Sequence, residues 1–188
     1  MVAPAETKTR WTMADLEFFP DNGDRHEIID GDLYVTRAPH WKHQKVLTCL
    51  CKALPSKGAN NKTGEVLQTP GLIFASDDNV IPDLVWISDE KLASCVDEAG
   101  HFTCAPELIV EVLSQKTQDI ARDRQVKLKL YSRVGVKEYW IVDWQRQTVE
   151  IYRRSQARLA LVSTLFSEDQ LTSPLFPDFS LNIAAIFD

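Results

Sequence analysis

The stretch Glu107-Leu-Ile-Val-Glu-Val-Leu-Ser114 is the most informative part of this sequence for both its fold and its function. Five of the six residues from Leu108 to Leu113 are Leu, Ile or Val, which is typical of a strand covered on both faces of a sheet. Glu111 stands in the middle of this run. Burying an ionised carboxylate there costs roughly several kcal/mol of folding free energy unless a positive group lies beside it. The sequence therefore predicts a metal ion or a lysine beside Glu111.

The segment that follows this strand predicts a β-α-β unit. A helix is expected from about Thr117 to Val134, and Gly135 stands just past its end, where a left-handed cap favours glycine. A second buried strand is expected over residues 138–143. Because such crossovers are right-handed and join parallel strands, the strands over 107–113 and 138–143 should be parallel.

The remaining elements predict an α/β domain in which a mixed sheet is flanked by helices and extended by β-hairpins. Before the central strand we expect a short helix capped by Thr12, a hairpin over 26–36 that turns at Asp30-Gly31, and a helix over 40–54. Strands over 65–69 and 72–75 should form a second hairpin, broken at Pro70-Gly71. Further strands are expected over 80–88, with Pro82 near the entrance, and over 147–153 and 159–166.

Length and composition indicate an ordinary globular protein. The chain has 188 residues, of which 44% are apolar and 26% charged. We expect a flexible tail over residues 1–11 and a single domain over 12–188. No apolar run approaches the roughly 18 residues of a membrane span, and the N-terminus lacks the apolar region of a secretory signal. A cytoplasmic protein without membrane contact is expected.

The four cysteines predict neither a zinc site nor a disulfide. Cys49, Cys51, Cys95 and Cys104 form no Cys-x-x-Cys pair, and the first two lie one residue apart in a helical pattern. Free thiols are expected.

The charge of the chain is unevenly distributed. The net charge of −6 argues against a wholly basic nucleic-acid binder. Residues 77–111 hold nine acids and one lysine, whereas residues 115–137 hold seven Lys or Arg and two Asp. An acidic site beside a basic helix suits the joint binding of a metal and a phosphate. The alternative is two solvated faces that attract each other.

The helix over 117–134 turns one lysine inward. On a wheel of about 100° per residue, the mean direction of its apolar side chains coincides with Lys127, and Lys129 points the opposite way. Lys127 is therefore expected within a buried face. Alternatively, its side chain extends to solvent or pairs with Asp123 one turn earlier.

Two carboxylates on buried strands, Asp83 and Glu111, form the candidate site. If their strands are neighbours, the carboxylates would repel unless a divalent cation joined them, and oxygen ligands favour Mg²⁺ or Mn²⁺. Taken alone, Asp83 after Pro82 could simply cap a turn. His43, on an apolar helical stripe, could be a core histidine, and Glu27 could be a surface acid.

Six pieces of the sequence, in order, resemble the Uma2 family of restriction-endonuclease-like proteins, which is similar to the PD-(D/E)xK nuclease superfamily. The resemblance covers about residues 12–186. The pieces are Glu27-Ile-Ile-Asp-Gly31, His43, Pro82-Asp83, the stretch from Pro106 to Ser114, Asp123-Arg-Gln-Val-Lys-Leu-Lys-Leu-Tyr131, and Gly135-Val-Lys-Glu-Tyr-Trp-Ile-Val-Asp143.

The resemblance implies a restriction-endonuclease-like fold and a site. Asp83 and Glu111 would be metal ligands, Glu27 a further ligand, and His43 a histidine near the site. One departure is Leu113, which stands where the superfamily has its lysine; the resemblance implies that Lys127 supplies it from the next helix.

The expected activity is that of a metal-dependent endonuclease acting on DNA, with Mg²⁺ or Mn²⁺, as a homodimer. Two rivals stay open. One is an inactive nuclease fold that binds nucleic acid or protein. The other is a structural ion network of Asp83, Glu111 and Lys127 without a metal.

Overall fold

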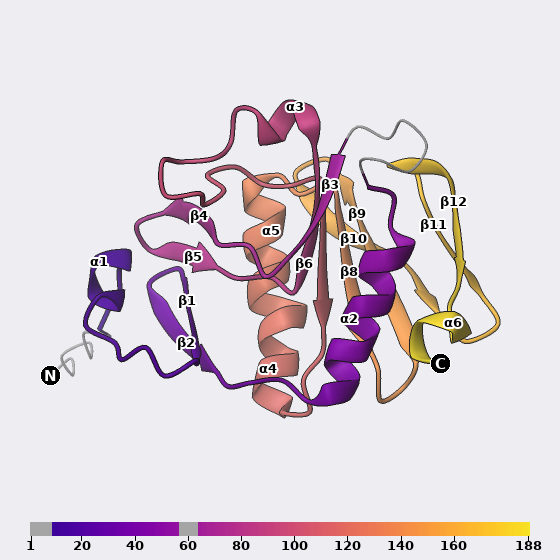
Figure 1. Ribbon diagram of the computed structural model, residues 1–188, viewed down its shortest axis with the longest axis horizontal. Coiled ribbons are helices and arrows are strands. Elements are labelled where there is room, and N and C mark those ends of the chain that lie inside the picture. Colours follow the sequence, from indigo (N-terminus) through magenta and orange to yellow (C-terminus); the bar gives the residue numbers. More distant parts are fainter. Residues whose placement is uncertain (1–8, 57–63) are drawn as a thin grey trace, which may run out of the picture.

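A six-stranded mixed sheet lies at the centre of the protein, with the strand order β10-β9-β8-β7-β6-β3 (Figure 1). The structure, a computed structural model, describes residues 9–56 and 64–188, so residues 1–8 of the predicted tail lie outside the described residues. The strands are β3 (Gly64–Gln68), β6 (Leu84–Ser88), β7 (Leu108–Val112), β8 (Glu138–Asp143), β9 (Thr148–Ser155) and β10 (Arg158–Leu165). β7 and β8 are parallel, which confirms the β-α-β prediction, and the other neighbouring strands are antiparallel.

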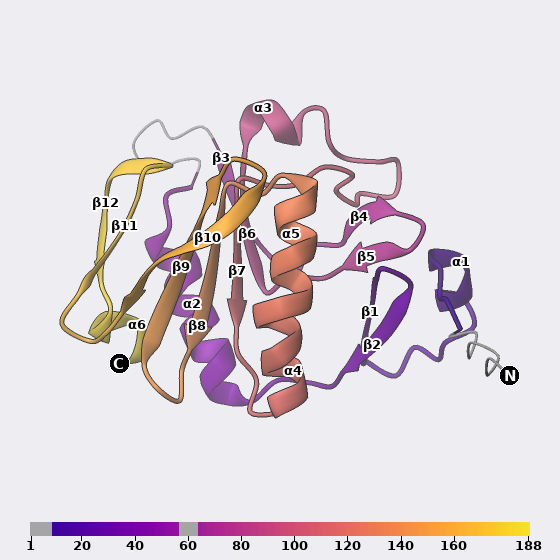
Figure 2. The ribbon, with the colours of Figure 1, turned by 180° about the vertical axis from the view of Figure 1, so that it is seen from behind.

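Helices cover both faces of this sheet, which confirms the predicted class (Figures 1 and 2). One face packs against α2 (Trp41–Ala53), α6 (Ala184–Phe187) and the hairpin of β11 (Gln170–Ser173) and β12 (Phe176–Asn182). The other face packs against one continuous helical segment made of α4 (Thr117–Ala121), η1 (Arg122–Lys127) and α5 (Leu128–Val134). Two further short helices are α1 (Met13–Leu16) and α3 (Asp89–Leu92). No helix in the described ranges is long and apolar enough to cross a membrane.

The alternation of side chains along the strands decides which residues face the helical segment α4–α5. Leu108 and Val110 pack in the core on the α2 side, whereas Ile109 packs on the opposite side with Leu130 of α5. Because side chains alternate along a strand, Glu111 follows Ile109 onto the α4–α5 side. The central strand therefore directs its carboxylate toward the predicted lysine helix.

A second sheet lies beside the first and carries the predicted hairpin (Figure 1). It contains β1 (Arg25–Ile29), β2 (Asp32–Thr36), β4 (Leu72–Ala75) and β5 (Asp78–Val80), in the order β2-β1-β5-β4. Asp30 and Gly31 both have positive φ angles, of 51° and 76°, which is the geometry of a two-residue type I′ hairpin turn. The hairpin prediction is confirmed.

The second predicted hairpin is wrong. Strands form at both predicted places, but β3 pairs with β6 and β4 pairs with β5, so the chain passes from one sheet to the other at Pro70-Gly71. The strand predicted over 80–88 is also divided, because β5 ends at Val80 and β6 begins at Leu84. Pro82 has no N–H to donate to a ladder, which fits a break at that point.

The cysteine prediction is half wrong. Cys49 and Cys51 are free, as expected, but Cys95 and Cys104 form a disulfide. The loop between the latter two folds back on itself through an antiparallel bridge between Val96 and Phe102, and their Cα atoms lie 5.4 Å apart. This closeness is made by the path of the loop, which sequence spacing does not reveal.

Candidate active site

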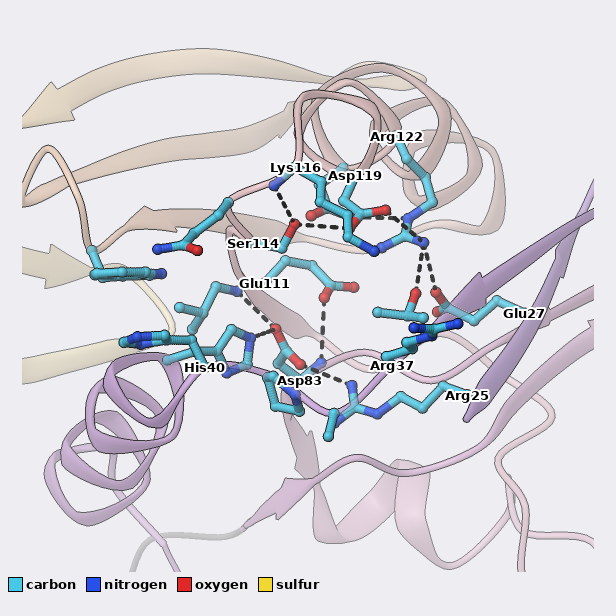
Figure 3. Close-up of a pocket in the computed structure, with 18 of the residues that line it drawn as sticks. Arg25, Glu27, Arg37, His40, Asp83, Glu111, Ser114, Lys116, Asp119 and Arg122 are labelled. Carbon is cyan, nitrogen blue, oxygen red and sulfur yellow. Dashed lines mark hydrogen bonds and ion pairs between the residues drawn. The ribbon is translucent and has the colours of Figure 1, made fainter. Parts of the chain in front are cut away.

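The five predicted site residues lie around one cavity of about 350 Å³ (Figure 3). We call the buried acidic residues at its bottom, together with the lysine there, the pocket floor; each of these residues is at most 4% exposed. The exposed residues Arg37, His40 and Lys116 form the pocket rim. The floor consists of Glu27 from β1, Asp83 before β6, Glu111 from β7, and Asp123 and Lys127 from η1.

Asp83 and Glu111 lie side by side on neighbouring strands. In the antiparallel register of β6 and β7, Leu84 pairs with Val110, so the next position along places Asp83 opposite Glu111. The Val112 N–H donates to Asp83 Oδ2 at 2.9 Å, and the Asp83 N–H makes a long contact of 3.4 Å with Glu111 Oε2. The side chain of Asp83 thus takes the place of a strand partner at the end of the ladder.

The guanidinium of Arg25 and the imidazole of His43 both contact the carboxylate of Asp83. Arg25 Nη1 lies 3.0 Å from Oδ1, and His43 Nε2 lies 3.0 Å from Oδ2. Burial alone would raise the pKa of Asp83, but the hydrogen bond and charge of His43, the Val112 N–H and Arg25 hold it well below its ordinary value. His43 is buried, as the core alternative expects, and it also contacts a predicted site residue.

Lys127 lies between two carboxylates. Its Nζ is 2.8 Å from Glu111 Oε1 and 2.9 Å from Glu27 Oε1, and the residue is 2% exposed. The side chain of Lys129 is 76% exposed. The inward direction predicted for Lys127 is therefore confirmed, and the alternative that its side chain reaches solvent is wrong. Leu113 is buried in the core on the same side of the sheet.

Further groups complete the surroundings of Glu111. Tyr131 donates its hydroxyl to Glu111 Oε1 at 2.9 Å, and Asp123 Oδ1 lies 3.8 Å from Lys127 Nζ. Burial, opposed by Lys127 and reinforced by the neighbouring carboxylates, raises the pKa of Glu111 to about 8. Burial likewise raises the pKa of Asp123 to about 6. Two carboxylates of the floor thus hold protons more tightly than usual.

The segment η1 is π-helical, a conformation that occurs mostly as short insertions in α-helices and is frequent at functional sites. Arg122 at its start donates to Thr36 Oγ1 at 2.9 Å and lies 3.8 Å from Glu27 Oε2. Through these contacts the helical segment joins the hairpin β1–β2. Glu27, for which a surface position was the alternative, is 2% exposed and also accepts the Ile81 N–H at 2.9 Å.

Sequence reasoning missed three residues of this network, although two of them carry a signal. Arg25 stands two residues before Glu27 and so projects to the same face of β1. Tyr131 stands four residues after Lys127, on the same helical face. Nothing in the local pattern distinguishes Arg122.

When all of them are ionised, the four carboxylates of the floor outnumber the three permanent cations that contact them. The four carboxylates belong to Glu27, Asp83, Glu111 and Asp123, and their Lys or Arg partners are Arg25, Arg122 and Lys127. Within residues 9–56 and 64–188, however, no three His, Cys, Asp or Glu side chains converge in a way that could hold a metal ion. Glu27 points to Lys127 and does not join Asp83 and Glu111 around one point.

A mixed sheet between helices, with paired carboxylates and a lysine in one cavity, defines a protein of the restriction-endonuclease-like class. The sequence matches the family model of Uma2, described as "Putative restriction endonuclease", over residues 13–184, and the chain belongs to this family. It is similar to a solved structure from Anabaena variabilis ATCC 29413, described as a "putative nuclease belonging to DUF820". The TM-score is 0.73 at 19% identity, over 94% of this chain and 97% of that chain, a likeness of fold. No curated protein matches the sequence.

Proposed function

We propose that the protein is an endonuclease that hydrolyses phosphodiester bonds of DNA with the help of Mg²⁺ or Mn²⁺. The observation that carries this proposal is the pair of carboxylates, Asp83 and Glu111, set on neighbouring strands at the floor of a cavity. The membership of the Uma2 family supports a nuclease. DNA is the substrate that the description of the family suggests.

The donor set fits a hard divalent cation. Carboxylate oxygens are the ligands that Mg²⁺ prefers, and this ion keeps several of its waters, so two protein carboxylates beside an open cavity suffice. Glu111 Oε2 makes only the long contact with the Asp83 N–H, which leaves it able to accept a ligand bond. Once Glu111 is ionised, the four carboxylates of the floor outnumber the three permanent cations beside them, which favours an added positive charge. Asp83 and Glu111 would hold the ion, and Glu27 would join them only after leaving Lys127.

The chain's own groups have distinct proposed roles. A bound divalent ion would supply an activated water and would offset charge on the scissile phosphate. Lys127 would stabilise the charge that grows on the phosphate oxygens, and Glu27 and Glu111 keep its ammonium in place. His43 and Arg25 would keep Asp83 ionised and correctly oriented.

The rim would bind the nucleic-acid backbone. Arg37 and Lys116 are exposed and make no ion pair with any carboxylate in the described part of the chain, so both are available to phosphates. A homodimer would place one site on each strand of a duplex at the same time, so the proposal includes a homodimer.

A structural ion network is the second candidate. It is favoured by the contacts of Glu111 Oε1, which already receives bonds from Lys127 and Tyr131. Such a network would need no metal and would cleave nothing.

Cleavage of a supercoiled plasmid in Mg²⁺ or Mn²⁺, with titration calorimetry of Mn²⁺, separates the two candidates. The nuclease proposal expects nicked or linear DNA and heat of binding, and E111Q should remove both. The matched control is E107Q, since Glu107 lies on the same core segment, is 4% exposed and bonds Ser88 outside the cavity. If the wild type neither cleaves nor binds Mn²⁺, the network stands and the nuclease proposal fails.

A further inference from the structure

A cluster of three aromatic rings stands beside the pocket on the side of α2. His40 and Trp144 both line the cavity, and their rings are stacked with centroids 5.0 Å apart and planes 9° from parallel. Trp41 follows, with its centroid 5.8 Å from that of His40. We call these three residues the aromatic shelf. Figure 3 shows His40 across the pocket from Glu27 and Arg122.

The shelf is held in place by hydrogen bonds. Trp144 Nε1 donates to the Leu113 carbonyl at 3.0 Å, and His40 Nδ1 accepts the Lys42 N–H at 3.2 Å. Leu113 lies two residues after Glu111 on the same segment, so the bond of Trp144 ties the shelf to the strand that carries the proposed metal ligand. The bond of Trp144 thus sets the position of this ring relative to the pocket floor, and His40, which stacks on it, links it to Trp41.

The outer part of the shelf is open and carries positive charge. Trp41 is 64% exposed, which is unusual for so large an apolar side chain. Lys42 Nζ lies 5.7 Å from the centroid of Trp41 and 5.6 Å from that of Trp144. An exposed indole beside a cation, next to the unpaired Arg37 and Lys116 of the rim, matches the combination with which proteins bind unpaired nucleotides.

A base that is paired within a duplex cannot stack on the aromatic shelf. The bases within a duplex have both faces covered by their neighbours, so they cannot stack on a protein ring until they leave the helix. A base in a single strand, an overhang or a flap has an open face and can stack at once. The shelf therefore distinguishes between these forms of substrate.

Resting on the proposed function, we propose that the aromatic shelf binds an unpaired base next to the scissile phosphate. The preferred substrates are then single-stranded DNA and duplexes with a single-stranded end or flap. The backbone of this strand passes between Arg37 and Lys116 into the pocket, and its base stacks on Trp41.

Binding in EDTA tests this inference without cleavage. Fluorescence anisotropy compares a labelled 12-nucleotide single strand with the blunt duplex of the same sequence. W41A should weaken single-strand binding by roughly 5- to 150-fold, the range for the loss of one base–aromatic stack. W41F should restore most of the affinity, and binding of the blunt duplex should change less than about twofold in either variant.

The control variant is F18A, because Phe18 is 87% exposed and stands two residues after α1, which Figure 1 shows at one edge of the molecule, away from α2. It should bind both oligonucleotides as the wild type does. Single-strand binding that W41A leaves unchanged, or no binding of the single strand, overturns the inference. Plasmid cleavage that depends on Glu111 would then still support the nuclease, so the two failures are distinguishable.

Discussion

Replacement of Lys127 by Met tests the charge arrangement of the pocket floor most sharply. The ammonium lies within 2.9 Å of one oxygen each of Glu27 and Glu111, and the residue is 2% exposed. Breaking a buried pair by removing one partner costs about 3–5 kcal/mol, because a charge stays behind without compensation. The pKa of Glu111 is already about 8, so this carboxyl can hold a proton at pH 7 and relieve part of the cost.

We therefore expect K127M to lower the free energy of unfolding by about 3 kcal/mol at pH 7 and by more at pH 9. For a chain of this length the loss corresponds to a drop in melting temperature of about 6–12 °C. Urea unfolding followed by circular dichroism measures it. K129M is the control, since Lys129 is largely exposed, and should change stability by less than about 0.5 kcal/mol. The error of such extrapolated free energies is on the order of 1 kcal/mol. If the unfolding free energy of K127M lies within about 1 kcal/mol of the wild-type value, the proposed charge balance is wrong.

Three further predictions concern the same framework. Y131F removes the hydroxyl that donates to Glu111 at 2.9 Å and should cost about 1–3 kcal/mol in urea unfolding; an unchanged midpoint would exclude this hydrogen bond. Because the pKa of Glu111 is raised from 4.5 to about 8, the folded protein holds a proton that the unfolded chain releases, so the unfolding free energy should fall as pH rises through this window. In EDTA, the plot of unfolding free energy against pH should be flatter for E111Q than for the wild type. An identical slope in the variant would mean that a group other than Glu111 holds the proton. Reduction of the Cys95–Cys104 disulfide, which spans 9 positions, should cost about 2–3 kcal/mol, and equal stability with and without reductant would contradict it.

The sequence predicted the centre of the site because the relevant patterns are local. The apolar run around Glu111 indicated a buried strand, and the wheel of the following helix turned Lys127 inward; the structure confirms both. The wheel assumed a regular α-helix and did not anticipate the π-helical segment. The prediction survived because the apolar residues that set its direction lie mostly after this segment, in register with Lys127.

What the sequence did not reveal depends on contacts between distant segments. Glu27 is buried because Arg122 and Lys127, about a hundred residues further on, cover it. The pairing of β3 with β6 and the bond between Cys95 and Cys104 likewise follow from the path of the chain. Hydrophobic periodicity carries no information on such pairings, so these predictions were wrong or left open between alternatives.

Diffraction from a crystal soaked in Mn²⁺ shows directly whether Asp83 and Glu111 hold a divalent ion together. The proposal expects an anomalous difference peak on the pocket floor, with one oxygen of Asp83 and one of Glu111 within about 2.0–2.6 Å of it. The same soak of E111Q crystals should show no peak. A wild-type crystal without a peak, in which Glu111 bonds only Lys127 and Tyr131, would contradict the metal site and favour the structural ion network.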